Sequence, residues 1–315
     1  MSEPLIDILM ATYNGVRFIG EQIESIQSQT YKNWRLLVSD DCSSDGTLDV
    51  VRRYAARDDR ISIVSEGLRY GGAMENFFAL MSKSDAPYCM FSDQDDVWLP
   101  RKIENEYHAA AARERLDGPD VPIAVYTDMA VVDARLHEIS PSFLEQEKKR
   151  DMRGDLRAFI TISGAAGCTM LFNRALRNLV AGSDCSLALM HDWWIGIVAA
   201  SCGALLYLDE PSMLYRQHSN NEVGAVSYSF WRRAVNFSES REKYWLSCKQ
   251  AEQILINYGQ RMNPENRSLV KVYANQLHAS SLHNLLSLQR HSLLKKKAGR
   301  RFAQILTLLL GAPGR

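Results

Sequence analysis

The stretch CMFSDQDDVWLP, residues 89–100, joins a short apolar run to three carboxylates, Asp93, Asp95 and Asp96. Two carboxylates about 4 Å apart repel each other by about 4 kcal/mol at the effective dielectric of a protein surface. Either the three side chains point apart into water as an ordinary loop, or a positive group lies among them. The sequence on both sides of this cluster indicates where it lies in the fold.

Apolar runs alternate with helical patterns through the first hundred residues. Strands are predicted over 5–11, 34–38, 61–64 and 88–91, and helices over 18–26, 47–56 and 74–81. This alternation predicts an α/β fold, with a mainly parallel sheet flanked by helices. Ligands bind such sheets beyond the carboxyl ends of the strands. Asp40 and Asp41 follow the second strand and the acid cluster follows the fourth, so both are expected at one binding edge.

The pattern changes twice further along the chain. Short strands are expected at 123–126, 168–172, 205–208 and 212–215, with helices at 102–113 and 193–200. Long helical patterns then cover 231–258, 264–288 and 292–310. We therefore expect an α/β domain over residues 1–226 and a C-terminal helical region over 227–315.

Bulk composition excludes several classes of protein. Lysine plus arginine and aspartate plus glutamate both number 37, so no overall charge favours a nucleic-acid partner. The six cysteines form no C-x-x-C pair, which argues against a zinc site and fits a reducing, cytoplasmic compartment. The N-terminal MSEPLIDILMATYNG lacks a basic region followed by an apolar core, so a first strand is expected rather than a signal peptide.

A divalent cation would reconcile the acid cluster with a phosphate ligand. Hard oxygen ligands and a substrate diphosphate are the usual partners of Mg²⁺ and Mn²⁺ in proteins. The alternative is a solvated loop that caps the helix starting near Pro100. Because the cluster follows a strand and faces a second acidic loop, we favour the metal. In that second loop, a carboxylate directly at a strand end, such as Asp40, could accept the imide N–H of uracil or thymine.

Six motifs in order resemble a known family. ATYNG (11–15), SDDCSSDGT (39–47), SDQDDVW (92–98), GCTMLFN (167–173), HDWW (191–194) and YRQHSNN (215–221) are together similar to family 2 glycosyltransferases. The resemblance covers about residues 4–225 and is greatest to the rhamnosyltransferase-like branch, which builds bacterial surface polysaccharides. It implies an inverting GT-A fold, a nucleotide-diphosphate-sugar donor, a divalent metal (Mg or Mn) and single-displacement transfer to a growing surface polysaccharide or lipid-linked glycan.

The resemblance also implies roles for single residues. Nucleotide contacts are expected from Ala11, Thr12, Tyr13, Asp40, Asp93 and Arg216, and metal contacts from Asp93, Asp95 and His218. Asp192 matches the catalytic base, and contacts to acceptor or donor sugar are expected from Asp96, Trp193, Trp194 and Gly167. The loop at Tyr70-Gly71-Gly72 lacks the asparagine that is common in the family, although Arg69 there could reach a phosphate.

Several of these residues have simpler structural explanations. An aspartate at a helix start, such as Asp192, is a good N-cap. Trp193 and Trp194 could be a sugar-stacking platform or two core indoles. The Gly164–Thr169 segment could be a packing turn, and a single histidine such as His218 is usually no metal ligand.

The tail, HSLLKKKAGRRFAQILTLLLG over 291–311, places five basic residues ahead of an apolar stretch. This pattern fits a surface helix on an anionic membrane, giving peripheral contact with the inner face of the cell membrane. The alternative is a last helix packed on the domain or on a second copy of the chain. Two competing functions remain: a sugar nucleotidyltransferase, disfavoured because ATYNGVRF carries only one basic residue, and a non-catalytic protein that binds nucleotide-sugar and metal.

Overall fold

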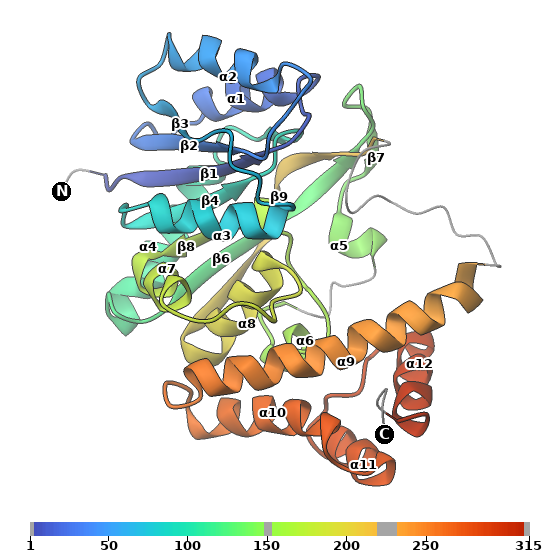
Figure 1. The fold of residues 1–315 in the computed structure, drawn as a ribbon. Helices are drawn as coiled ribbons and strands as arrows, with labels where there is room; N and C mark the ends of the chain where they lie inside the picture. The colour runs from blue at the N-terminus through green and yellow to red at the C-terminus, as the bar shows by residue number, and fades with distance from the viewer. Residues whose placement is uncertain (1–2, 148–152, 219–231, 312–315) are drawn as a thin grey trace.

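A twisted open sheet forms the centre of the computed structural model, which describes residues 3–147, 153–218 and 232–311 (Figure 1). The described strands follow the order β3-β2-β1-β4-β8-β6-β9-β5, and β7 pairs with β6. Their bounds are β1 (Ile6–Thr12), β2 (Trp34–Asp40), β3 (Ile61–Ser65), β4 (Tyr88–Ser92), β5 (Val97–Trp98), β6 (Ile123–Val132), β7 (Glu138–Ser140), β8 (Met170–Asn173) and β9 (Ala204–Arg216).

Helices cover both faces of this sheet and extend beyond it toward the C-terminus (Figure 1). Their bounds are α1 (Ile19–Gln27), α2 (Thr47–Ala55), α3 (Ala73–Lys83), α4 (Lys102–Asp117), α5 (Phe143–Gln146), α6 (Leu156–Phe159), α7 (Arg174–Ala181), α8 (His191–Cys202), α9 (Arg232–Tyr258), α10 (Pro264–Ala274), α11 (Ser281–Arg290) and α12 (Ala298–Leu309). The described residues also include two 3₁₀ turns, η2 (Gly167–Thr169) and η3 (Asn275–Leu277).

Alternate residues of each central strand face two separate hydrophobic clusters. In β1, Ile6, Ile8 and Met10 join the cluster beneath α1, α2 and α4, whereas Leu9 joins the cluster beneath α3, α7 and α8. Strands that are buried on both faces appear in sequence as continuous apolar runs, which is why the first four were predictable.

The parallel arrangement of the first four strands is confirmed. β1 pairs in parallel with β2 and β4, and β2 pairs in parallel with β3. Thr12 lies opposite Asp40, and Met10 lies opposite Ser92, so the loops after β1, β2 and β4 leave the sheet at one edge. The later strands make the sheet mixed, because β8 runs antiparallel to both β4 and β6.

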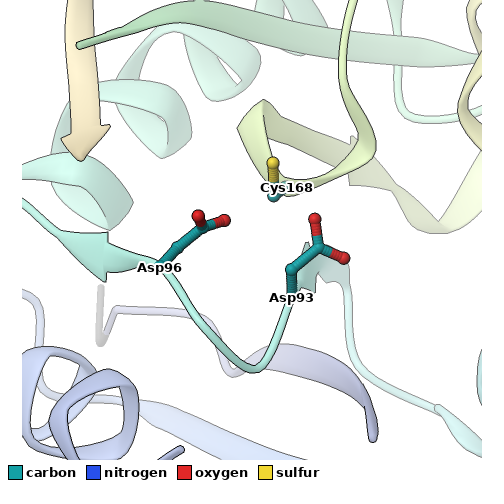
Figure 2. Close-up of side chains that lie close together, drawn as sticks. All are labelled: Asp93, Asp96 and Cys168. Atoms are coloured by element: carbon teal, nitrogen blue, oxygen red, sulfur yellow. The ribbon is translucent and has the colours of Figure 1, made fainter. Parts of the chain in front are cut away.

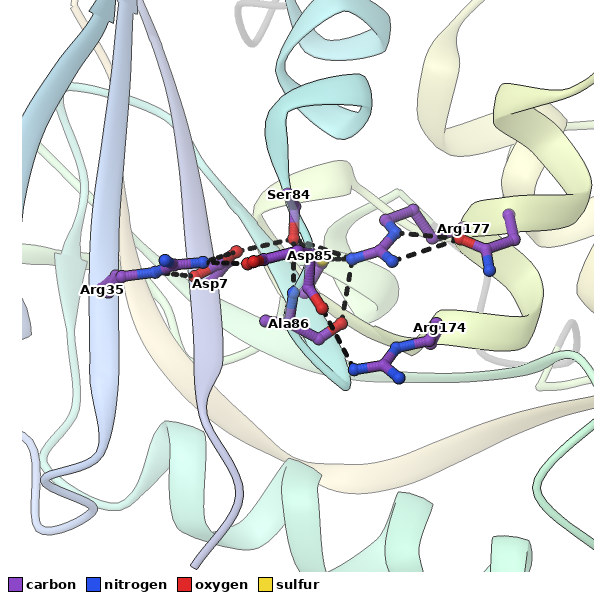
Figure 3. Close-up of polar contacts among 9 residues, drawn as sticks. Asp7, Arg35, Ser84, Asp85, Ala86, Arg174 and Arg177 are labelled. Carbon is purple, nitrogen blue, oxygen red and sulfur yellow. Dashed lines mark hydrogen bonds and ion pairs between the residues drawn. The ribbon is translucent and has the colours of Figure 1, made fainter.

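An ion network fixes the opposite, amino-terminal end of the sheet (Figure 3). Asp7 of β1 is fully buried and pairs with Arg35 of β2, Nε to Oδ1, at 2.8 Å. Ser84 donates to Asp7 at 2.6 Å and accepts from Arg177 at 2.9 Å, which ties α3 and α7 to the same point. This polar cluster is therefore structural and leaves the carboxyl edge for binding.

The C-terminal helices pack on the α/β part rather than apart from it. One hydrophobic cluster includes Leu9 of β1, Trp194 of α8 and Leu308 of α12. The boundary expected at residue 226 lies outside the described residues, so the division into 1–226 and 227–315 stays a prediction. No helix in the described ranges is long and apolar enough to cross a membrane.

The helix expected over 264–288 is interrupted in the structure. α10 ends at Ala274, and α11 starts after Ser280, whose hydroxyl accepts from the backbone of His283 at 3.5 Å. The side chain of Asn284 donates to the carbonyl of Gln276 at 2.8 Å and stabilises the bend. These local side-chain bonds compete with the helix, and apolar periodicity alone does not reveal them.

Candidate active site

The acid cluster lies in the loop between β4 and β5 and divides into two groups. Potential ligand atoms of Asp93, Asp96 and Cys168 all lie within 4.8 Å of one another, with Cys168 contributed by the turn before β8 (Figure 2). Asp95 is not part of this group, and its Oδ2 lies 2.8 Å from His218 Nε2. The structure therefore groups Asp93 with Asp96, whereas the sequence had suggested Asp93 with Asp95 and His218.

Arg216 and His218 of the chain itself lie beside these carboxylates. The guanidinium of Arg216, only 1% exposed, donates through Nε to the Asp95 carbonyl at 2.8 Å. It also pairs with Glu21 at 2.5 Å and lies over the ring of Phe18, 4.6 Å from the centroid. The His218 ring stacks on the Phe18 ring, with the two ring centroids 4.8 Å apart. Arg216 and His218 thus hold the acid loop in shape.

This geometry bears on the phosphate contact expected of Arg216. Its guanidinium donates to the Asp95 and Ala134 carbonyls and to the half-exposed carboxylate of Glu21. In the described arrangement the residue positions the loop. That contact stays a prediction.

Asp96 is the most buried of the three acids. Burial raises the pKa of its carboxyl well above the usual range, and the charges of Asp95 and Asp93 raise it further. Its Oδ1 accepts from the backbone of Arg216 at 3.3 Å, whereas its Oδ2 accepts no hydrogen bond within the described part of the chain. A buried carboxylate oxygen without a donor is costly, which a bound cation would relieve.

The residues of this group fit a Mg²⁺ or Mn²⁺ ion. Carboxylate oxygens are the ligands that both ions prefer, and Asp93 and Asp96 bring theirs together. Burial raises the pKa of the Cys168 thiol well above its usual range, and the charge of Asp93 raises it further. The protonated thiol is a poor ligand for a hard ion, so Cys168 is better described as a wall of the site.

The end of β1 is tied to the acid loop by Gln94. Its side-chain amide accepts from the Tyr13 backbone N–H at 3.0 Å and donates to the Tyr13 carbonyl at 2.8 Å. Gly15 allows this approach, because a Cβ there would lie 2.2 Å from Gln94 Oε1. Tyr13, 53% exposed, is thus presented at the edge of the sheet. This role of Gln94 was not predicted, since one glutamine has no diagnostic spacing.

Asp40 and Asp41 take different positions at the end of β2. Asp40 is fully buried and accepts from Thr12 Oγ1 at 2.7 Å and from the Ser43 backbone N–H at 2.8 Å. Asp41 accepts from the backbone N–H groups of Tyr70 and Gly71, and so holds the loop that carries the exposed Arg69. Asp40 therefore shapes this corner, and its reading of a nucleobase stays a prediction.

Asp192 lies in the first turn of α8 and contacts the turn that carries Cys168. Its Oδ2 accepts from the Gly167 backbone N–H at 3.0 Å, and its Oδ1 accepts from the Trp193 backbone N–H at 2.6 Å. The N-cap of α8 is Met190, which gives no side-chain cap, so Asp192 is not the N-cap that its position suggested. Through Gly167 and Cys168, Asp192 is placed beside the acid group of β4.

His191 forms the unpredicted floor of this region. Its ring lies 4.3 Å from that of Phe77 and 4.8 Å from that of Phe91, and neither ring nitrogen has a partner within the described residues. Burial lowers the pKa of His191 to about 3. A Cβ on Gly167 would lie 2.5 Å from His191 Nε2, so glycine is needed for this close approach.

The two tryptophans after Asp192 differ in position. Trp194 is fully buried and donates to the Tyr258 hydroxyl at 3.3 Å, so the core explanation describes it and stacking on a sugar does not. Trp193 is partly exposed and donates to the Phe159 carbonyl at 2.6 Å, which connects α8 to α6. Trp193 remains the candidate for contact with a sugar.

Comparisons with known proteins bear on the family and the fold of the chain. The family described as Glycosyl transferase family 2 matches residues 7–179. The chain is 30% identical over 251 residues to the dTDP-rhamnosyl transferase RfbG of Shigella flexneri, covering 75% of this chain and 80% of that relative. It is 38% identical over 104 residues to the UDP-Glc:alpha-D-GlcNAc-diphosphoundecaprenol beta-1,3-glucosyltransferase WfgD of Escherichia coli, covering 33% of this chain and 40% of that relative.

A solved structure gives the same fold. The mannosyltransferase PcManGT from Pyrobaculum calidifontis, in complex with GDP-Man and Mn²⁺, superimposes with a TM-score of 0.54 and 16% sequence identity. The superposition covers 98% of this chain and 86% of that one. The likeness confirms the predicted GT-A fold, and at this identity it shows the fold alone.

Proposed function

Since the chain belongs to glycosyl transferase family 2, we propose that it moves a sugar, rhamnose first among the candidates, from a nucleotide-diphosphate donor to a growing surface polysaccharide or lipid-linked glycan. One observation carries the proposal. The loop after β4, the η2 turn and the first turn of α8 bring Asp93, Asp96, Gly167 and Asp192 to one edge of the sheet. This grouping supports the proposal that acids for a donor diphosphate and a base for an acceptor hydroxyl act at one site.

The donor is proposed to bind along the carboxyl edge of the first strands. Ala11, Thr12 and Tyr13 would lie beside the nucleobase, with Asp40 fixing the corner through Thr12. The relative RfbG is named for dTDP-rhamnose, so a thymine nucleotide is the first to test. Arg69, which is exposed in the β3–α3 loop, is proposed to contact a phosphate of the donor.

A divalent ion, Mg²⁺ or Mn²⁺, is proposed to join donor and enzyme. Asp93 and Asp96 would hold it, and Asp95 with His218 lies next to them as a second pair of ligands. When bound, such an ion stabilises negative charge on the departing diphosphate. The unpartnered Oδ2 of Asp96 supports this assignment.

Asp192 is proposed as the general base. A base must hold its carboxylate in a fixed direction to take a proton from the acceptor hydroxyl during attack on the anomeric carbon. The two backbone N–H groups at Gly167 and Trp193 supply that fixed direction. A carboxylate oxygen has two lone pairs, so an oxygen that accepts a backbone N–H is still a base.

The test is a transfer assay with dTDP-rhamnose and a glycan acceptor, using Asp192→Asn. Loss of a general base is expected to lower kcat by about 10²- to 10⁴-fold while donor affinity is retained. Asp184→Asn, at an exposed acid just before α8, is the matched control and should keep wild-type kcat. Transfer by Asp192→Asn at the wild-type rate would remove Asp192 from this role.

The C-terminal helices are proposed to lie on an anionic membrane at its cytoplasmic face. Four large apolar side chains of α11 and α12 are more than half exposed: Leu282, Leu286, Phe302 and Leu309. The two helices are joined by a bond from Ser281 Oγ to the Leu308 carbonyl at 2.7 Å, so their apolar residues lie on neighbouring elements. The basic residues ahead of α12 complement anionic headgroups.

Sedimentation with anionic liposomes tests this contact. The double variant Phe302→Ser, Leu309→Ser should reduce the bound fraction, because apolar burial and charge attraction act together at an interface. Leu116→Ser on α4, an 81% exposed leucine distant in sequence, is the matched control. Equal sedimentation of both variants would refute membrane docking through these helices.

A further inference from the structure

Three buried polar side chains in and just after α1 face the segment that carries the acid loop, residues 93–96. Gln22 and Ser25 lie three residues apart and so share one side of α1, and Gln29 follows the end of the helix. Gln22 and Gln29 are fully buried, and Ser25 is nearly so. The other buried residues of α1 are isoleucines. A buried amide is unfavourable unless its hydrogen bonds are made, so the partners of these side chains matter.

The amide of Gln22 contacts both ends of the acid loop. Its oxygen accepts from Ser92 Oγ at 2.8 Å, just before the loop, and from Trp98 Nε1 at 3.1 Å, just beyond it. Its nitrogen donates to the Asp96 carbonyl at 2.8 Å and to Ser25 Oγ at 3.0 Å. The reverse orientation would point the amide nitrogen at the indole N–H, so the hydrogen-bond network assigns this one. All four hydrogen-bonding positions of the amide are used.

Ser25 and Gln29 hold the segment that follows the loop. Ser25 Oγ accepts from the Trp98 backbone N–H at 3.0 Å. Gln29 donates to the Leu99 carbonyl at 2.9 Å and accepts from the Ile103 backbone N–H at 3.2 Å. The attachment of this segment to α1 therefore does not depend on Gln22 alone. Among the described contacts of the two glutamines, those to the acid loop are made by Gln22.

The contacts of Gln22 bear directly on the distance between Asp93 and Asp96. Ser92 is the last residue of β4 and directly precedes Asp93, and the same amide holds the Asp96 carbonyl. One side chain thus bridges the backbone on either side of the loop, whose two acids point toward a common space (Figure 2).

A fixed separation of two carboxylates selects between ions by size. Mg²⁺ takes oxygen ligands at about 2.0–2.1 Å in near-octahedral geometry, whereas Ca²⁺ takes them at about 2.3–2.6 Å in flexible geometry. A loop that cannot widen therefore favours the smaller ion.

Packing alone does not call for an amide at this position. Gln22 lies between Ile19, Ile23 and Ile26, which belong to the hydrophobic cluster beneath α1. An apolar side chain would fill the same space, but it could not bond to Ser92 and Asp96 together. The amide is therefore explained by the loop that it bridges.

We propose that Gln22 is a positioning residue for the metal: its amide fixes the separation of Asp93 and Asp96 that a small divalent ion requires. This inference rests on the proposed function, which assigns the ion to these two acids. Gln22 acts through Ser92 and the Asp96 carbonyl, and it is not itself a ligand. Hydrogen-bond partners of ligand residues commonly change metal affinity about 10- to 100-fold.

Mn²⁺ titration of the full chain without donor, with the free ion followed by electron paramagnetic resonance, tests the proposal. Gln22→Leu removes the amide at similar volume and should weaken Mn²⁺ binding about 10- to 100-fold. Gln29→Leu removes an equally buried amide that bonds outside the loop. This matched control should lose thermal stability to a similar extent and still bind Mn²⁺ as wild type does. Equal Mn²⁺ affinity in wild type and Gln22→Leu would overturn the role of Gln22.

Competition by Ca²⁺ separates positioning from general support of the loop. Wild type should prefer Mn²⁺ to Ca²⁺, and Gln22→Leu should lose about tenfold of this preference, because a released loop can widen around the larger ion. Gln29→Leu should keep the wild-type preference. If Gln22→Leu lost affinity for both ions equally, Gln22 would only support the folded loop, and the positioning role would be wrong.

A milder variant keeps the test decisive if Gln22→Leu proves unstable. Ser92→Ala removes one partner of the amide and changes little volume, so Mn²⁺ binding should weaken about threefold. Unchanged binding by this variant would contradict the bridge. Absence of Mn²⁺ binding in wild type would overturn the proposed metal site itself, and the role of Gln22 with it. Equal binding by wild type and both variants would overturn the role of Gln22 alone.

Discussion

Acid should destabilise this protein through His191, and the size of the effect follows from the burial of its ring. The imidazole is 4% exposed, lies between Phe77 and Phe91, and has a pKa of about 3 rather than 6.5. The folded state therefore binds fewer protons than the unfolded state whenever the pH is below the unfolded value. Stability contributed by the neutral ring is complete above pH 6.5 and is lost as the pH falls toward 3.

The magnitude can be worked out for a practical pH range. Between about pH 7.5 and pH 5, protonation of His191 in the unfolded chain lowers the free energy of unfolding by about 2 kcal/mol, at 1.36 kcal/mol per pH unit below 6.5. His191→Leu keeps an apolar side chain of similar size and removes the proton site. At neutral pH this variant should be as stable as wild type or slightly more so, because two unpaired nitrogens are lost.

Urea unfolding of wild type and His191→Leu at the two pH values measures the difference. All other titrating groups are shared, so their contributions cancel when the two pH-dependent losses are subtracted. Wild type should lose about 2 kcal/mol more than the variant. The same loss in both proteins would show that the ring is already protonated or solvated in the folded state, and the reasoning would be refuted.

Three further variants test other parts of the site. Trp194→Ala should lower the free energy of unfolding by about 3–5 kcal/mol because its indole is fully buried, and Trp193→Ala should cost less by the same urea measurement. Gly167→Ala should lower kcat by about 10- to 100-fold in the transfer assay with donor affinity retained, because the new Cβ must displace His191 by about 1 Å. Gly299→Ala, in open space on α12, should keep the wild-type kcat. Arg216→Gln should lose about 1–3 kcal/mol in urea unfolding, because the buried guanidinium bonds of the acid loop are broken, whereas Glu21→Gln removes one half-exposed partner and should lose less.

The sequence predicted the architecture of the first half of the chain and the location of the site. Continuous apolar strands alternating with helices specified the parallel strands, and acids at two strand ends specified the binding edge. The order of six motifs then identified the family. Both lines of reasoning use local patterns, which a single sequence displays directly.

The pairing of side chains within the site could not be predicted. Asp93 lies with Asp96 and Cys168 because η2 passes beside the acid loop, and this contact joins residues more than 70 positions apart. Asp95 instead lies beside His218, which follows the end of β9. Gln94 bonds to the backbone of Tyr13, and the His191 ring packs against the ring of Phe77. Neither contact has a periodic pattern in the sequence.

The bend between α10 and α11 shows the same limit in the fold. Apolar spacing continues across residues 275–280, yet Ser280 and Asn284 bond to the local backbone and end the helix. The free-energy difference between such side-chain bonds and helical backbone bonds is small. Whether the helix continues therefore depends on how the segment packs.

Binding of Mn²⁺ and a nucleotide-sugar donor tests the central claim most directly. Electron paramagnetic resonance would follow Mn²⁺ bound to wild type and to Asp93→Asn, with and without dTDP-rhamnose, and Asp117→Asn at the end of α4 would serve as the control. We expect wild type and the control to bind Mn²⁺ more tightly when the donor is present, and Asp93→Asn to lose this gain. Equal Mn²⁺ binding by wild type and Asp93→Asn, with no effect of the donor, would contradict the account.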